Sequence, residues 1–333
     1  MGSTASLGDS VSSFLGAVEA FFGNLASVRW GLLLLGVLLH GAFVGLRSRA
    51  WFNTLRAAYP TERFRWRNVW AAQVVSLGIN SVIPARAGDA ARLYLTKQSI
   101  PRSSYSAVGS SFFVESVFDS AVGVVLLIFA AAQGVLPDLP SLSRLPAFDL
   151  AYLAQHPDFA LFLITVLLVG AWVAVGVLSA RVRAFWSRVR QGLTILGNRR
   201  RYLREVAAFQ AVAWLVRLGA FWLVLEAFHI GGSLRAALLV AAVFGLASLV
   251  PFTPQGAGAQ QALLAVVFAG VASSSQVAAY SVGQQLSLAA FNVLVGFLAL
   301  TLVFRTTDWR SIIRRGGTEV RADEAPTREA ASA

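Results

Sequence analysis

The sequence predicts an all-α polytopic membrane protein, with about eight membrane segments in an inverted-topology repeat that contains two broken or re-entrant helix pairs. First, 56% of the 333 residues are hydrophobic and only 13% are charged, a balance too apolar for a soluble chain of this length. Second, stretches such as 160–180 reach the roughly 20 residues that cross a hydrocarbon core. Third, prolines cut two apolar stretches short, Pro84 in one and Pro251 with Pro254 in the other.

Composition also excludes several classes of function. The chain has no cysteine and three scattered histidines, so thiol chemistry is ruled out and we expect neither a metal nor another cofactor. The formal net charge of +12 would suggest nucleic-acid binding in a soluble protein. Here the arginines lie between the apolar stretches, as in the cytoplasmic loops of membrane proteins, so no nucleic acid is expected as a partner.

The membrane segments are expected to form one transmembrane domain, residues 29–305. Residues 1–28 precede it as an amphipathic interfacial segment, because Phe14, Val18 and Leu25 recur at helical spacing. Residues 306–333 follow as a polar cytoplasmic tail that we expect to be disordered. The expected spans are 29–47, 69–84, 105–135, 159–180, 205–228, 236–253, 258–273 and 278–305.

Arginine-rich loops predict which ends of the spans face the cytoplasm. Residues 47–68 hold six arginines, 181–204 hold eight and the tail after Phe304 holds six, whereas 136–158 hold only Arg144. The positive-inside rule therefore places the first three regions, and with them the C-terminus, in the cytoplasm. We expect a multi-pass protein of the cell (inner) membrane.

Eight simple crossings do not satisfy this orientation. It is satisfied if 69–103 and 236–273 each return to the side from which they enter, which leaves five complete crossings. Two complete crossings within each broken pair satisfy it equally well, so both arrangements stay open.

A shift of 170 positions matches the two halves of the chain, about 29–135 and 205–305, which 136–204 link. The shift lays Pro84 on Pro254, Ala87 on Ala257, Gly88 on Gly258, Leu93 on Leu263, Ser111 on Ser281 and Glu115 on Gln285. Because the halves run in opposite directions, the repeat is inverted. Inverted repeats with paired broken helices indicate a transporter whose site lies near the bilayer midplane; ordinary proline-kinked helices are the alternative.

Charged residues gather at the first break, where Arg86, Asp89 and Arg92 follow Pro84. Charges at membrane depth are costly and usually functional. Gly88 permits a close approach of the backbone, and a helix that begins just before it would aim its N–H groups and Arg86 at an anion. The alternative is a self-contained network at the cytoplasmic interface, in which Asp89 caps the helix or pairs with Arg92.

A polar stripe follows on the next span, where Ser111, Glu115, Asp119 and Gly123 recur every four residues. Gly123 offers a place for another backbone to approach. The two carboxylates need partners in a membrane, and the candidates are Arg86, Arg92 and Arg217. A carboxylate without a partner would carry a proton that drives transport, and a structural salt bridge is the equal alternative.

The second break is rich in glycine and carries no charge. Its candidate residues are Gln255, Gly256, Gly258 and Gln261, with Gln285 on the following span. They offer hydrogen bonds, so the two halves together would hold a phosphate on the arginine side and headgroup hydroxyls on the amide side. Contact between helices is the alternative. Tryptophans near the span ends are interpreted as interfacial anchors, for example Trp30, Trp51 and Trp309.

The breaks and the stripe resemble the lysylphosphatidylglycerol synthase transmembrane-region family, the flippase-like membrane domain also found in multiple peptide resistance factors. The resemblance covers about 29–305 and rests on residues 80–92, 115–119, 254–261 and 285–296. The family usually has glutamate at Gln261 and arginine near Gln285, so no ion pair is expected in the second half. No aminoacyl-transferase domain follows the last span, so lipid aminoacylation by this chain alone is not expected.

The resemblance implies a lipid flippase or transporter that translocates an anionic phospholipid or glycolipid headgroup across the inner membrane, rather than an enzyme. Arg86 and Arg92 would hold the headgroup, and Glu115 and Asp119 would gate the site or couple it to protons. One alternative is a membrane enzyme or accessory factor that acts on polyprenyl-phosphate-linked sugars; another is a non-catalytic lipid-binding partner. Candidate partners are membrane lipids, a second copy of the chain in a homodimer and a separate lipid-modifying enzyme.

Overall fold

The computed structural model describes residue 19 and residues 23–83, 87–133, 186–247, 258–312 and 314. The regular structure of these residues is entirely helical, which confirms the all-α class. The expected span 159–180, most of the N-terminal segment and the tail beyond residue 314 lie outside the described residues. So do three predicted site residues, Arg86, Gln255 and Gly256.

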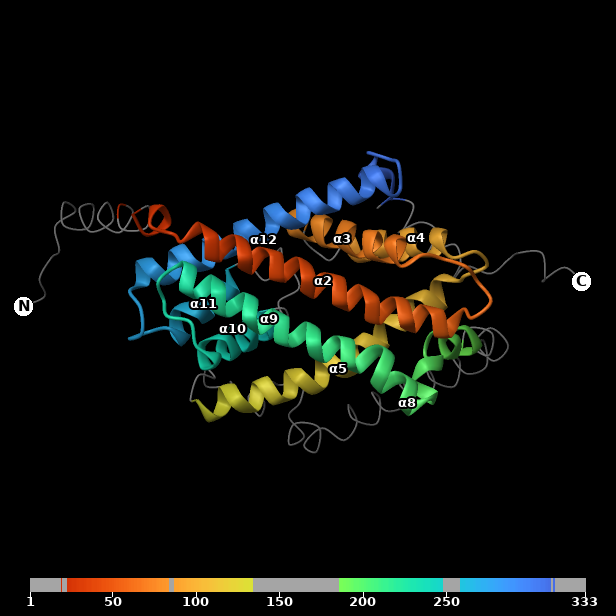
Figure 1. The fold of residues 1–333 in the computed structure, drawn as a ribbon, viewed down its shortest axis with the longest axis horizontal. Helices are drawn as coiled ribbons and strands as arrows, with labels where there is room; N and C mark the ends of the chain where they lie inside the picture. Colours follow the sequence, from red (N-terminus) through yellow and green to blue (C-terminus); the bar gives the residue numbers. More distant parts are fainter. Residues whose placement is uncertain are drawn as a thin grey trace, which may run out of the picture.

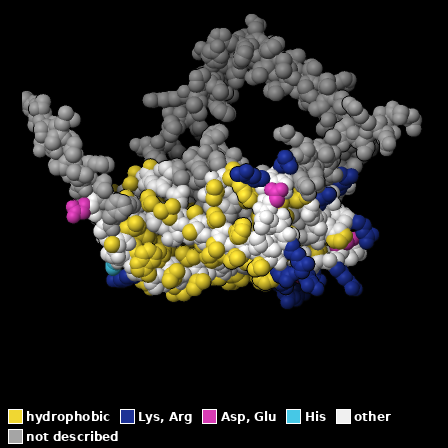
Figure 2. All heavy atoms as spheres, turned by 90° about the horizontal axis from the view of Figure 1, so that it is seen from above, with side chains coloured by type: hydrophobic (Ala, Val, Ile, Leu, Met, Phe, Trp, Pro, Cys, Tyr) yellow, Lys and Arg dark blue, Asp and Glu magenta, His cyan; other side chains and the backbone are white. Residues whose placement is uncertain are grey.

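Four helices of the described residues are long and apolar enough to cross a membrane. They are α2 (Trp30–Ala58), α5 (Tyr105–Ala132), α12 (Ser274–Leu302) and the continuous helix of α8 (Arg199–Tyr202), η4 (Leu203–Ala207) and α9 (Ala208–Ala227). All four run along the long axis of the molecule (Figure 1). Large apolar side chains cover their outer faces (Figure 2), for example Leu38, Phe113 and Leu215. The protein is therefore a multi-pass membrane protein.

The shorter helices form two hairpins at the expected breaks. In the first hairpin α3 (Trp66–Val82) packs against α4 (Ala87–Ser99), and in the second α10 (Leu234–Ala247) packs against α11 (Ala259–Val267). Helix α11 ends at Val267, short of the expected span end at residue 273, and residues 248–253 of the other expected span lie outside the described residues. As described, each of these four helices is shorter than the roughly 20 residues that usually cross a bilayer core.

Both outer ends of the first hairpin lie at the same end of the molecule. Arg102 in the turn after α4 pairs with Glu62 in the turn before α3, with 3.2 Å between Nε and Oε1. The backbone N–H of Ser104 donates to the hydroxyl of Tyr59, at the end of α2 (3.3 Å). Most basic side chains visible in Figure 2 lie toward one end of the molecule. We call the end formed by residues 59–65 and 100–104 the arginine-rich end.

The second hairpin begins and ends at the opposite end. There Arg29 N–H donates to the carbonyl oxygen of Ala227 (3.0 Å), which joins the start of α2 to the end of α9. Arg235 at the start of α10 donates to Gln133 after α5 (2.7 Å). The Asn24 amide donates to the Ser275 hydroxyl at the start of α12 (3.1 Å). Each hairpin therefore returns to the end from which it starts.

Local sequence explains several helix ends. The hydroxyl of Ser104 accepts a hydrogen bond from Ala107 N–H at the start of α5 (3.2 Å), and Ser273 with Gln276 forms a capping box at the start of α12. Gly258 precedes α11 with φ of +86°, a conformation that favours glycine.

Helix α2 ends at Ala58, so the expected end of the first span at residue 47 was wrong. The helix continues because Trp51 and Leu55 are fully buried and pack against Val69, Ile100 and Val108 of the neighbouring segments. The interpretation of Trp51 as an interfacial anchor was also wrong, whereas Trp30 and Trp309 are exposed as expected.

Candidate functional site

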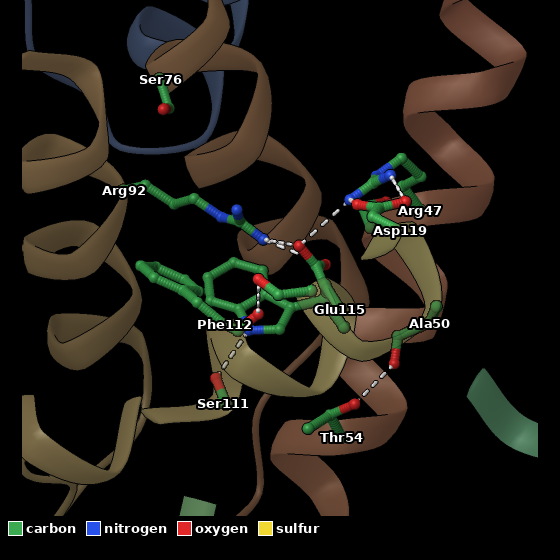
Figure 3. A network of polar contacts seen from close by, with 12 residues as sticks. Arg47, Ala50, Thr54, Ser76, Arg92, Ser111, Phe112, Glu115 and Asp119 are labelled. Atoms are coloured by element: carbon green, nitrogen blue, oxygen red, sulfur yellow. Dashed lines mark hydrogen bonds and ion pairs between the residues drawn. The ribbon is translucent and has the colours of Figure 1, made fainter. Parts of the chain in front are cut away.

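A network of charged side chains joins α2, α4 and α5 (Figure 3). Arg47 of α2 donates from Nη1 and Nη2 to the two carboxylate oxygens of Asp119 of α5, at 2.8 and 2.7 Å. This bidentate geometry is the strongest form of arginine–carboxylate pairing. The same Nη2 lies 3.6 Å from Oε2 of Glu115. One arginine therefore joins both carboxylates of the polar stripe.

Arg92 of α4 reaches Glu115 from the other side. Its Nη2 lies 3.2 and 3.3 Å from the two carboxylate oxygens, and its guanidinium carbon lies 3.7 Å from the ring centroid of Trp51 and 4.5 Å from that of Phe112. Only 8% of Arg92 and 6% of Glu115 is exposed. Cation–π contacts in such dry surroundings contribute roughly 2 kcal/mol. A carboxylate and two aromatic rings therefore enclose the Arg92 guanidinium.

Two tryptophans fix the positions of these carboxylates and rings. The indole N–H of Trp51 donates to the hydroxyl of Ser111 (2.8 Å), and the indole N–H of Trp214 of α9 donates to Asp119 Oδ1 (3.1 Å). Ser111 and Glu115 are buried, and Asp119 points into the same network. The expected close approach at Gly123 is wrong for the described residues, because no other atom lies within 4 Å of a Cβ built there.

The first break is closed by side chains of α3. Asp89 Oδ1 accepts hydrogen bonds from Asn80 Nδ2 (3.2 Å) and Ser76 Oγ (3.4 Å), and Gly88 N–H donates to Asn80 Oδ1 (2.8 Å). A Cβ at Gly88 would clash with the Ser76 carbonyl oxygen, so the backbones approach closely there. Within the described residues Asp89 is bound by hydroxyl and amide groups and forms no ion pair with Arg92.

The second half joins its hairpin to the next long helix through amides. Gln261 Nε2 of α11 donates to Gln285 Oε1 of α12 (2.6 Å); Gln285 is the counterpart of Glu115, and Gln261 is one residue before the counterpart of Arg92. Gly258 N–H donates to Gln261 Oε1. His40 Nε2 of α2 and Asn292 Oδ1 of α12 are 3.1 Å apart. Hydrogen bonds therefore take the place of charge in this half.

Arg217 of α9 lies beside the network among aromatic rings. Its guanidinium carbon is 4.9 Å from the ring centroid of Trp214, 5.1 Å from that of Phe43 and 5.3 Å from that of Phe221. No carboxylate of the described residues lies within ion-pair distance of it. Of the two predicted arginine partners that the structure describes, Arg92 pairs with a carboxylate and Arg217 does not.

Sequence reasoning missed Arg47, which binds both carboxylates. It was assigned to a cytoplasmic loop because it begins an arginine-rich stretch. One signal was present in the sequence, since the shift of 170 positions lays Arg47 on Arg217.

An apolar cavity of about 240 Å³ lies between α3 and α12. Its walls include Val75, Ile79, Val293 and Phe297, and it reaches Ile83 at the break. Such a predominantly apolar lining fits a hydrocarbon chain.

These features define a class: multi-pass α-helical membrane proteins with a charge network among their spans. The family model of the lysylphosphatidylglycerol synthase TM region matches residues 11–296. The chain belongs to this family, which confirms the resemblance and places the protein in lipid metabolism or transport. No curated protein matches the chain in a sequence search.

Proposed function

We propose that this protein translocates an anionic phospholipid or glycolipid across the inner membrane. The observation that carries the proposal is the charge network of Arg47, Arg92, Glu115 and Asp119 near the middle of membrane-spanning helices. Each such charge costs at least about 2.5–3.5 kcal/mol in a bilayer core. Charges in this position usually mark a path for a polar substrate.

The helix boundaries support an inverted repeat. A shift of 170 residues carries α2 to 200–228, next to the observed Arg199–Ala227, and carries α5 to 275–302, next to Ser274–Leu302. The contacts are related in the same way, because α3 packs against α12 as α10 packs against α5, and α2 packs against its counterpart α9. In Figure 1, α2 and α9 run in opposite directions. Paired broken helices in such a repeat are typical of transporters.

The topology that we propose places the arginine-rich end in the cytoplasm. The hairpins α3–α4 and α10–α11 then enter from opposite sides and stop within the membrane, and 159–180 supplies the fifth crossing. This is the first of the two arrangements consistent with the positive-inside rule. Non-helical backbone at membrane depth is tolerated where it lines a polar site, which is the role we assign to the breaks that hold Arg86, Gln255 and Gly256.

We assign different roles to the charged residues. Arg92 and Arg47 are held by carboxylates and rings, so they build the frame of the site rather than bind the headgroup. Arg86, in the break itself, is the arginine that we expect to meet the headgroup at the entrance.

The cavity between α3 and α12 is the proposed place for an acyl chain. Gly258, Gln261 and Gln285 supply hydrogen bonds for headgroup hydroxyls.

The test is headgroup movement in proteoliposomes. Purified protein is reconstituted with fluorescent phospholipids or polyprenyl-phosphate glycolipids, and the accessibility of the label to a reducing agent is followed. We expect the wild type to move an anionic lipid, the Arg86→Ala variant to lose this movement, and the control Arg200→Ala, at an exposed residue of α8, to keep it.

Absence of movement for every lipid would overturn the transporter proposal. Turnover of a polyprenyl-phosphate sugar that requires a divalent metal would favour the enzyme alternative instead.

A further inference from the structure

Arg217 is the counterpart of Arg47 in the other half, but its carboxylate partners are missing. The shift of 170 residues lays Arg47 on Arg217, Glu115 on Gln285 and Asp119 on Ala289. In the first half both carboxylates neutralise Arg47. In the second half an amide and a methyl group occupy the same positions, so neither of these two positions supplies a carboxylate.

The arginine is nevertheless held in place beside the network. Trp214 donates its indole N–H to Asp119 and presents its ring to the Arg217 guanidinium at 4.9 Å. Phe43 is shared, since it lies 5.7 Å from the Arg47 guanidinium carbon and 5.1 Å from that of Arg217. Aromatic contacts orient a guanidinium and leave its N–H groups available for other acceptors.

The ion pairs of the network leave Arg217 without a close anion among the described residues. Glu115 and Asp119 both lie within ion-pair distance of Arg47, and Glu115 also of Arg92, whereas no carboxylate of the described residues lies so close to Arg217. The nearest further acid on α4, Asp89, is bound by Asn80 and Ser76. An isolated cation inside a membrane protein is costly unless an anion accompanies it.

We propose that Arg217 binds the phosphate of the transported lipid, midway across the membrane. The assignment rests on the proposed function insofar as the anion is taken to belong to a lipid. The planar guanidinium fork matches two phosphate oxygens, and one bound phosphodiester gives Arg217 the close anion that it lacks among the described residues. A zwitterionic lipid would bring its own cation to this positive site, so Arg217 also selects anionic headgroups over zwitterionic ones.

Direct lipid binding tests this assignment without transport. Purified protein in detergent is titrated with brominated phosphatidylglycerol or brominated phosphatidylcholine, and quenching of tryptophan fluorescence reports binding. We expect the wild type to prefer phosphatidylglycerol. Arg217→Gln should weaken phosphatidylglycerol binding roughly tenfold or more, as expected for loss of a charge-assisted contact, and leave phosphatidylcholine binding unchanged. Arg200→Gln, at an exposed position, is the matched control.

A second variant keeps the arginine and supplies the missing carboxylate. Ala289 lies one turn before Asn292, which faces His40 of α2, so both residues share one face of α12. Ala289→Asp is expected to neutralise Arg217 and to weaken phosphatidylglycerol binding as Arg217→Gln does.

The outcomes distinguish the assignment of Arg217 to the lipid phosphate from the proposal that the protein translocates lipid. Phosphatidylglycerol binding that is unchanged in Arg217→Gln overturns the phosphate assignment, whatever the transport assay gives. Arg217-dependent binding without any lipid movement by the wild type supports the assignment and overturns translocation. If the wild type does not prefer brominated phosphatidylglycerol over brominated phosphatidylcholine, the lipid assignment is wrong.

Discussion

Replacing Glu115 by alanine is expected to destabilise the protein by about 3–5 kcal/mol, the usual effect of breaking a buried ion pair from one side. The carboxylate lies 3.2 Å from Arg92 and 3.6 Å from Arg47. Arg47 keeps Asp119, whereas Arg92 is left buried with aromatic rings alone. The measurement is the unfolding midpoint of the purified variant in detergent, compared with the wild type.

The exposed pair Arg201–Glu205 provides the control. Both side chains are 41% exposed, so Glu205→Ala should change stability by no more than about 0.5 kcal/mol. The double variant Arg92→Met/Glu115→Met removes both charges and should recover most of the loss. If Glu115→Ala and Glu205→Ala lower the stability equally, Glu115 does not stabilise the protein through a buried ion pair.

Gly88→Ala is expected to cost about 1–3 kcal/mol, the usual effect of overpacking. The new methyl group would meet the Ser76 carbonyl oxygen and the Asn80 side chain, whose Cγ lies 2.9 Å from the Cβ position. Helix α4 would then move away from α3 and carry Arg92 with it. We expect a lower unfolding midpoint together with a slower lipid translocation rate.

Gly123→Ala is the matched control on α5. Among the described residues nothing lies within 4 Å of its Cβ position, so the substitution should stabilise the helix by about 0.5–1 kcal/mol through higher helix propensity. A Gly88→Ala protein as stable and active as Gly123→Ala would show that α3 and α4 do not require their close contact.

Polar residues inside apolar stretches made the site partly predictable from sequence. Glu115 and Asp119 stand out on α5 because a membrane helix rarely carries two acids, and the structure places both in one network. The pairing of Arg92 with Glu115 was among the expected alternatives. The breaks were predictable because proline and glycine mark them directly.

Arg47 and Trp51 were not predictable in the same way. In sequence, an arginine of a buried ion pair looks the same as an arginine of a cytoplasmic loop, and the positive-inside rule favours the loop. Trp51 looks like an interfacial anchor until its ring is seen against Arg92 at 3.7 Å. Both roles depend on α2 lying next to α4 and α5. The spacing of residues along one helix does not predict which other helices will be its neighbours.

The unequal strength of the two hairpin attachments has a mechanical consequence. The first hairpin is held to α5 by a buried ion pair, Arg92–Glu115, and the second to α12 by a neutral amide bond, Gln261–Gln285. A neutral hydrogen bond contributes about 0.5–1.5 kcal/mol net, well below the cost of breaking a buried ion pair. We therefore expect the second hairpin to separate from α12 more readily than the first separates from α5. The second hairpin, which is attached without charge, is then the more mobile of the two.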